Sequence, residues 1–325
     1  MKHFLFLFVC RCRELKEVCC LEAAMELINV HKNIGKKQII KNLNFEIRKG
    51  EVFGLLGPNG AGKTTTIRMM VGLMKMTSGD IKINGHSIKK DYKNAIRHVG
   101  AIVENPEMYP FLSGWKNLKH YARMIPGITD ERIREVIQLV GLEKAIKEKA
   151  GRYSLGMRQR LGVAQALLHR PSILILDEPT NGLDPAGIRE IRQYIRKLAE
   201  EENVSVIVSS HLLSEIELMC DRIGIIKNGE LLSVENVKDA QDQAENQKVK
   251  VTLELAPATQ AKEILSSYEI TGETEQTVTL EIMKEEIPAI IKTLALEDVQ
   301  IYEVNVERTS LEDKFFQWIG ENTIA

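Results

Sequence analysis

Nine residues in the first third of the chain combine glycines, a lysine and hydroxyls at a spacing that suits phosphate chemistry. They read GPNGAGKTT and fit the pattern GxxxxGK[ST]: Gly57, Pro58, Asn59, Gly60, Ala61, Gly62, Lys63, Thr64 and Thr65. The glycines let backbone N–H groups turn toward phosphate oxygens. Lys63 can reach the β- and γ-phosphates, and the Thr64 hydroxyl suits Mg²⁺. A glycine-rich surface turn is the alternative, but the pattern predicts a nucleotide-binding loop.

Two adjacent acids could complete this chemistry. Asp177 and Glu178 directly follow the aliphatic run Ile173 to Leu176, which predicts a parallel strand buried on both faces. Ligands of open α/β sheets collect at the carboxyl ends of such strands. We expect Asp177 to hold Mg²⁺ through water and Glu178 to be the general base for the attacking water, a role worth about 10²–10⁴ in rate. The alternative is a strand end with two solvated acids.

The segments around these residues predict alternating strands and helices. Glu51 to Leu56 indicates a short buried strand before the phosphate loop, and Thr65 to Leu73 after it is compatible with a helix. The sequence YSLGMRQ, from Tyr153 to Gln159, opens another helix with Ser154 as its N-cap. We therefore predict an α/β fold of the P-loop type, with the acids and the loop at one sheet edge.

The order of these motifs resembles that of the ATP-binding subunits of ABC transporters. The phosphate loop is followed by YSLGMRQ, by ILILDEP, by the turn from Asn181 to Asp184, and by His211 after the apolar strand from Val204 to Val208. The resemblance implies an ATPase cassette with a helical subdomain. It also implies ATP and Mg²⁺ as cofactors, and a separate integral-membrane permease as partner.

The resemblance also implies that the site is completed by a second ATPase subunit. Ser154 and Gly156 match positions of the signature segment, which in the family contacts the γ-phosphate of ATP held by the other protomer. Asp184 resembles the aspartate that communicates across that interface. His211 resembles the switch histidine near the γ-phosphate, although an isolated histidine after a strand is more often structural. A homodimer or heterodimer of ATPase subunits is therefore expected.

Two positions depart from the common family pattern. Glu104 stands where most relatives carry a glutamine close to Mg²⁺, and we expect its carboxylate to serve the metal. Ile34 stands where most relatives carry the aromatic that stacks on adenine, and His31 is the alternative for that contact. With Glu104 and the YSLGM form of the signature, the sequence resembles members of the bacitracin-resistance and lantibiotic-immunity branch of the family. The predicted function is to energise export of, or protection against, peptide antibiotics.

Two other function classes compete with this prediction. A soluble ABC ATPase of translation or DNA maintenance is the main alternative, but such members carry two cassettes or long coiled-coil insertions, and this chain shows one cassette without heptads. A P-loop GTPase or kinase is the third class, but membership of that class would not explain the YSLGMRQ segment or His211. The net charge of −1 shows no excess of basic residues of the kind that binds nucleic acid, so we expect no nucleic-acid partner.

Composition predicts where the protein works and how the chain is divided. The most apolar run, Phe4 to Cys10, is too short to span a membrane, since spanning needs about 20 residues. We therefore expect a peripheral protein at the cytoplasmic face of the membrane, held by its permease. Residues 1–24 hold four of the five cysteines and read as a disordered or extraneous leader, with a metal-binding tail as the alternative.

The remaining chain divides into a cassette, a linker and a small domain. We expect the ATPase domain over residues 25–232, with helices from Asn105 to Gly151 and from Arg189 to Glu202. The polar residues 233–247 read as a linker or surface helix. Residues 248–325 repeat strand and helix and predict an accessory α+β domain of ferredoxin-like type. The apolar stripe from Ser310 to Ile319 is predicted to be core or interface rather than a membrane anchor.

Overall fold

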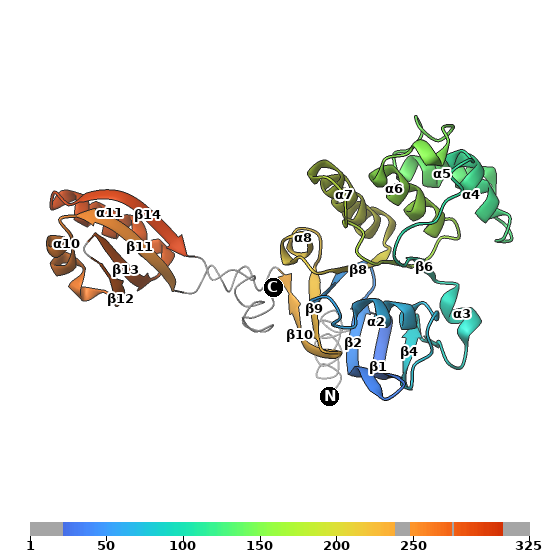
Figure 1. Ribbon diagram of the computed structural model, residues 1–325, viewed down its shortest axis with the longest axis horizontal. Coiled ribbons are helices and arrows are strands. Elements are labelled where there is room, and N and C mark those ends of the chain that lie inside the picture. Colours follow the sequence, from blue (N-terminus) through green and yellow to red (C-terminus); the bar gives the residue numbers. More distant parts are fainter. Residues whose placement is uncertain (1–21, 238–247, 275, 308–325) are drawn as a thin grey trace, which may run out of the picture. The chain divides into compact units, whose positions relative to one another are not determined.

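The computed structural model describes residues 22–237, 248–274 and 276–307, which belong to two compact units that divide after Val234 (Figure 1). The predictions for residues 1–21 and for the stripe from Ser310 to Ile319 lie outside the described residues. None of the helices in the described ranges combines the length and the hydropathy that a membrane crossing needs.

A six-stranded sheet is the centre of the first unit. Its order is β10-β9-β3-β8-β7-β6, and the strands are β10 (Glu230–Asn236), β9 (Arg222–Lys227), β3 (Val52–Leu56), β8 (Ser205–Ser210), β7 (Ile173–Leu176) and β6 (Val99–Ile102). The five strands from β9 to β6 pair in parallel. Every residue of β3, β7 and β8 is buried, as expected for strands covered on both faces.

Two helices after the sheet strands show how the chain returns across the sheet. Helix α7 (Pro185–Glu202) packs against β8 and β3, and the short helix α8 (Leu213–Glu217) follows β8. Helix α7 buries Ile191, Ile195 and Leu198, the predicted apolar face. It begins four residues before the predicted Arg189, because Asp184 caps it and proline is favoured in the first turn.

A second, four-stranded sheet packs over the phosphate-loop helix. Its order is β2-β1-β4-β5, formed by β1 (Ala23–Ile34), β2 (Lys37–Arg48), β4 (Ser78–Ile83) and β5 (His86–Ser87). Helix α2 (Lys63–Met70) buries Ile67, Met69 and Met70 in the core shared with this sheet. Strand β1 begins at Ala23, two residues before the predicted first strand residue Met25, and Ala24 is only 1% exposed.

The predicted helical subdomain lies beyond the β6 edge of the six-stranded sheet, and its helix α6 contacts β6 (Figure 1). It contains α4 (Gly114–Ala122), α5 (Asp130–Leu139), the 3-10 turn η1 (Ala150–Arg152) and α6 (Leu155–Ala166), while α3 (Tyr92–Ile96) lies next to β5. Serine or threonine side chains cap all three α-helices of the subdomain, at Ser113, Thr129 and Ser154. These caps explain why each helix starts where it does.

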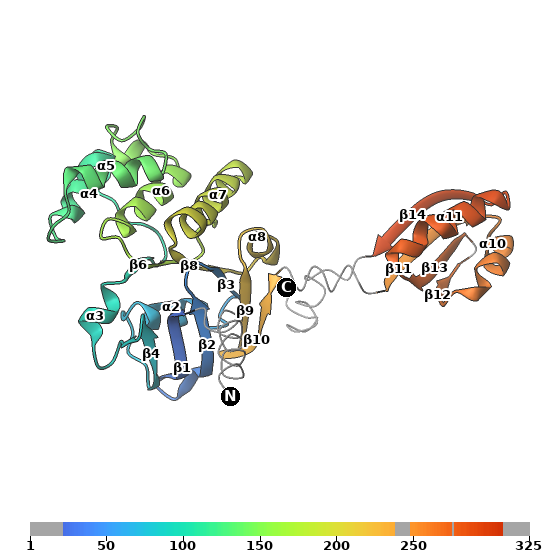
Figure 2. The same ribbon diagram turned by 180° about the vertical axis from the view of Figure 1, so that it is seen from behind.

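The second unit has the βαββαβ order of a ferredoxin-like fold, which confirms the predicted small α+β domain. The elements are β11 (Val249–Ala256), α10 (Ala258–Ile264), η2 (Leu265–Ser267), β12 (Ile270–Glu273), β13 (Thr277–Ile282), η3 (Lys284–Glu286), α11 (Ile287–Leu296) and β14 (Gln300–Glu307). The sheet order is β12-β13-β11-β14, with antiparallel pairs throughout. Alternate residues of β11, among them Val251 and Leu253, are buried in the core of this unit. Figure 2 shows the elements of this unit from behind.

Two strands in the chain after Gly229 differ from the sequence prediction. The short strand β12 was missed, because its four residues include Gly272 and show little apolar alternation. The expected linker at residues 233–247 begins as strand, since β10 continues to Asn236 and Val237 is buried. An edge strand needs only one covered face, which explains how a polar segment can still be a strand.

Candidate active site

The phosphate loop joins the fully buried strand β3 to helix α2. Helix α2 begins at Lys63, and its N-cap, Gly62, has φ 112° and provides no side-chain cap. A Cβ at Gly57 would lie 2.2 Å from the carbonyl oxygen of Ile226, so only glycine fits between the loop and β9. The N–H groups of the first turn are therefore not taken by a capping side chain, which is the arrangement that favours phosphate at a helix N-terminus.

Lys63 lies inside the loop rather than in solvent. Its Nζ donates to the carbonyl oxygen of Gly57 at 2.7 Å and lies 3.3 Å from Oε1 of Glu178, and the residue is only 6% exposed. The loop and the strand-end acid are thus joined by a partly buried ion pair. Such a pair has little screening from water, so it orients both side chains.

Asp177 and Glu178 follow β7, and a serine of the next strand contacts both. Asp177 is 4% exposed, and its Oδ1 accepts from Oγ of Ser209 at 2.6 Å. The same Oγ accepts the backbone N–H of Glu178 at 2.8 Å. Glu178 has φ 50°, in the left-handed region, which costs a non-glycine residue roughly 1–3 kcal/mol and is found mainly at functional sites.

His211 lies in the loop after β8 and reaches the same acid. Its Nδ1 is 2.7 Å from Oε2 of Glu178. Because an ionised carboxylate only accepts hydrogen bonds, Nδ1 carries the hydrogen when Glu178 is charged. Both carboxylate oxygens of Glu178 therefore have a cationic or donor partner, Lys63 on one side and His211 on the other.

Glu104 approaches the site from the segment after β6. It has φ 67° and forms an ion pair with Arg68 of α2. Both side chains of this pair are exposed, so its contribution to stability is small, about 0–1 kcal/mol. Glu104 is therefore free to exchange Arg68 for another partner at little cost.

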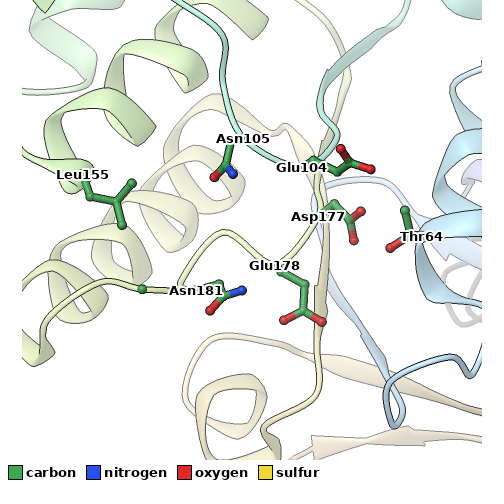
Figure 3. Close-up of a pocket in the computed structure, with 8 residues that line it drawn as sticks. Thr64, Glu104, Asn105, Leu155, Asp177, Glu178 and Asn181 are labelled. Atoms are coloured by element: carbon green, nitrogen blue, oxygen red, sulfur yellow. The ribbon is translucent and has the colours of Figure 1, made fainter. Parts of the chain in front are cut away.

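One cavity of about 580 Å³ brings Glu104, Asp177 and Glu178 together with Thr64 of the phosphate loop (Figure 3). Its lining consists of Thr64, Glu104, Asn105, Leu155, Asp177, Glu178, Asn181 and Gly182. In Figure 3 the oxygens of Thr64, Glu104 and Asp177 gather on one side, and Leu155 of α6 lies across from them. The three predicted metal ligands thus share one cavity, next to the predicted general base.

The remaining predicted site residues do not belong to this lining. Ser154 accepts the N–H of Met157 at 3.2 Å and Asp184 accepts that of Gly187 at 3.0 Å, so both side chains cap helices. A Cβ at Gly156 would lie 3.8 Å from Leu183, which places the signature beside the turn before α7. These residues flank the cavity through their neighbours Leu155 and Gly182.

The two candidates for the adenine contact lie on β1. Ile34 is 52% exposed at the end of the strand, and Nδ1 of His31 accepts the N–H of Asn42 in the neighbouring strand. His31 therefore uses one ring nitrogen inside the sheet. Ile34 offers an exposed aliphatic surface rather than an aromatic face.

Sequence reasoning missed four groups at or near the cavity: Arg68, Asn105, Asn181 and Ser209. The sequence predicts Asn181 only as part of a turn. Ser209 stands in the run Ser209-Ser210-His211 at the end of a predicted strand, and polar residues at that place were the available signal. The strand order that sets Ser209 next to Asp177 was not readable from the sequence.

Comparisons with known proteins agree with this geometry. The family described as ABC transporter matches residues 40–181, which include the phosphate loop and both strand-end acids. The chain is 56% identical over 301 residues to YhcH of Bacillus subtilis (strain 168), an ABC transporter ATP-binding protein, and this match covers 93% of the chain and 97% of YhcH.

Two further relatives have names that specify what they transport. The bacitracin transport ATP-binding protein BcrA of Enterococcus faecalis is 37% identical over 94% of this chain and 99% of its own. The lantibiotic transport ATP-binding protein SrtF of Streptococcus pyogenes is 41% identical over 64% of this chain and 89% of its own. Among solved structures, the dimeric, post-hydrolysis ATP-binding cassette MJ0796 with ADP and Pi superimposes with a TM-score of 0.59, at 27% identity over 66% of this chain and 98% of that chain.

Proposed function

Since this chain belongs to the ABC transporter family, as one of its ATP-binding subunits, we propose that the cavity at Thr64, Asp177 and Glu178 is where it hydrolyses ATP. The ATPase activity itself follows from the family. The observation that carries the assignment is the meeting of three separate segments at one cavity. The phosphate loop, the end of β7 and the segment after β6 supply a hydroxyl and three carboxylates there.

The donor atoms suit magnesium. Thr64, Asp177 and Glu104 offer only oxygen, which hard cations prefer. Among the described residues no group of three or more His, Cys, Asp or Glu side chains forms an all-protein metal site. This fits an ion that keeps several waters and takes one or two carboxylates together with substrate phosphates. Bound there, Mg²⁺ would neutralise charge on the β- and γ-phosphates.

The contacts of Glu178 suggest which role each side chain has in ATP hydrolysis. Phosphate oxygens compete with Oε1 of Glu178 for the Lys63 ammonium, 3.3 Å away. When Lys63 binds phosphate, the carboxylate can accept the proton of the attacking water. His211 holds Oε2 through Nδ1, which leaves Nε2 for the γ-phosphate. One histidine would thus orient the base and contact the substrate.

A dimer would complete the site. Ser154, Gly156 and Asp184 do not line this chain's own cavity, although their neighbours Leu155 and Gly182 do. We infer that these residues serve the ATP of a second subunit, identical or different. The dimeric MJ0796 cassette with ADP and Pi supports this reading. Ser154 Oγ accepts the N–H of Met157, and the other N–H groups at the start of α6 are donors that suit phosphate.

The transported substrate is proposed from relatives. BcrA and SrtF are named for bacitracin and lantibiotic transport, and both compounds are peptide antibiotics. We infer that this subunit drives export of such peptides through a separate membrane permease, bound at the cytoplasmic face. The match to BcrA runs over 308 residues, more than the 234 of the first unit, so it includes part of the second unit. We propose that the second unit is an accessory domain of this transporter class.

Resistance measurements test the proposal. Cells that produce this chain with its permease should tolerate more bacitracin or lantibiotic than cells that produce the Lys63→Ala variant, which lacks the phosphate ligand. The purified chain should hydrolyse ATP only with a divalent cation. Equal sensitivity of both strains to every peptide antibiotic, with hydrolysis intact, would overturn the export assignment. Hydrolysis by Lys63→Ala at the wild-type rate would overturn the site.

A further inference from the structure

We propose that Ser209 is a positioning residue that holds Asp177 and Glu178 together through one hydroxyl. Its Oγ donates to Oδ1 of Asp177 at 2.6 Å and accepts the backbone N–H of Glu178 at 2.8 Å. A serine hydroxyl has one donor and two acceptor sites, so it can make both bonds at once. The inference rests on the proposed roles of these two acids.

Strand pairing sets this contact. Strand β8 lies between β3 and β7, and Leu176 of β7 pairs with Val208 of β8. The next residues along the two parallel strands, Asp177 and Ser209, therefore emerge side by side. Ser209 thus stands level with Asp177, where its side chain reaches the acids at the end of β7.

Burial makes the contact specific. Ser209 is 0% exposed and Asp177 is 4% exposed, so water has little access to compete for either group. A hydrogen bond to a charged carboxylate is strong in such surroundings, and a lost partner is not replaced. The bond to Oδ1 therefore fixes the orientation of the Asp177 carboxylate, and its other oxygen stays available for metal-bound water.

The second bond concerns the backbone of Glu178. This residue has φ 50°, a conformation that a non-glycine residue keeps only when surrounding contacts hold it. Its backbone N–H donates a hydrogen bond to Oγ of Ser209, so the strained peptide has a buried hydrogen-bond partner. An aliphatic side chain at position 209 would remove both bonds, so the acid that holds the metal and the proposed base would loosen together.

Metal affinity is the direct readout. Removing an outer partner of a metal-binding carboxylate typically costs 10–100-fold in metal affinity. We would measure binding of a fluorescent ATP analogue at increasing Mg²⁺, and in EDTA, for Ser209→Ala, Ser209→Thr and Asp177→Asn. Ser205→Ala is the matched control, because Ser205 is a buried serine of the same strand whose Oγ accepts the Gly50 N–H at 3.0 Å. Thermal melting without nucleotide reports on stability separately.

Ser209→Ala should bind the analogue in EDTA as wild type does, but need about tenfold more Mg²⁺ for its metal-dependent binding. Ser209→Thr, which keeps the hydroxyl, should move back toward wild type. Ser205→Ala should keep the wild-type Mg²⁺ requirement even where its melting temperature falls. An unchanged Mg²⁺ requirement in Ser209→Ala, with a raised one in Asp177→Asn, overturns the role of Ser209. An unchanged requirement in Asp177→Asn overturns instead the proposed metal role of Asp177.

Discussion

The imidazole of His211 and the carboxylate of Glu178 are in direct contact, with Nδ1 2.7 Å from Oε2, although the two residues are 33 positions apart in the chain. The other carboxylate oxygen lies 3.3 Å from Nζ of Lys63. Three segments therefore fix the orientation of one acid. This arrangement decides what substitutions at each of the three positions should do.

Substitutions of His211 should separate its contact with the base from its contact with substrate. His211→Ala loses both nitrogens, and we expect kcat to fall about 100-fold, since hydrogen bonds to charged groups contribute about 1.5–3 kcal/mol. His211→Asn places an amide donor near the Nδ1 position and should recover part of this loss. Steady-state phosphate release at saturating ATP measures the effect. Equal rates for the Asn and Ala variants would show that the contact with Glu178 does not contribute.

Glu178→Gln should bind ATP but nearly stop turnover. The amide fits the same space and can still contact His211, but it cannot accept the proton of the attacking water, so a loss of about 10²–10⁴ in kcat is expected. The variant should accumulate as an ATP-bound dimer in size-exclusion chromatography. Lys63→Ala serves as the contrast, because it should weaken ATP binding itself. Hydrolysis by Glu178→Gln at a near-normal rate would remove Glu178 from the role of base.

Mixing two inactive variants should restore activity if the site is shared between subunits. Ser154 caps α6, so we choose Ser154→Asp, which keeps a good N-cap but sets a negative charge against the γ-phosphate. A mixture with Lys63→Ala should form heterodimers with one intact site. ATP hydrolysis of the mixture, compared with each variant alone, gives the result. Heterodimers that form but stay inactive would contradict the composite site.

Glu104 should link hydrolysis to transport. Glu104→Gln keeps an oxygen that can approach the metal and should retain much of the transport, whereas Glu104→Ala should uncouple it and leave some ATP hydrolysis. Resistance to bacitracin in cells with the permease, together with ATPase rates of the purified protein, separates the two effects. Arg68→Ala is the matched control, because it removes the ion-pair partner of Glu104 but leaves the carboxylate. Full protection by Glu104→Ala would refute the coupling role.

The local pattern of the sequence was sufficient for the main elements. The phosphate loop, the buried strand before Asp177 and the helix after Ser154 were all predicted, because glycine spacing, aliphatic runs and N-caps act over a few residues. The first and last residues of these elements were predicted less accurately. Helix α7 starts at Pro185 and β1 at Ala23, since caps and strand partners outside the periodic stretch decide such ends.

What the sequence determined by itself was therefore the set of chemical groups and the family to which they belong. The tertiary structure decided which of them meet. Ser209 contacts Asp177 because β8 lies beside β7, although the 18-residue helix α7 separates the two strands in the chain. The pairing of Glu104 with Arg68 likewise joins the segment after β6 to α2. Neighbours in a parallel sheet are set by long crossover connections and shared burial, and no local pattern records them.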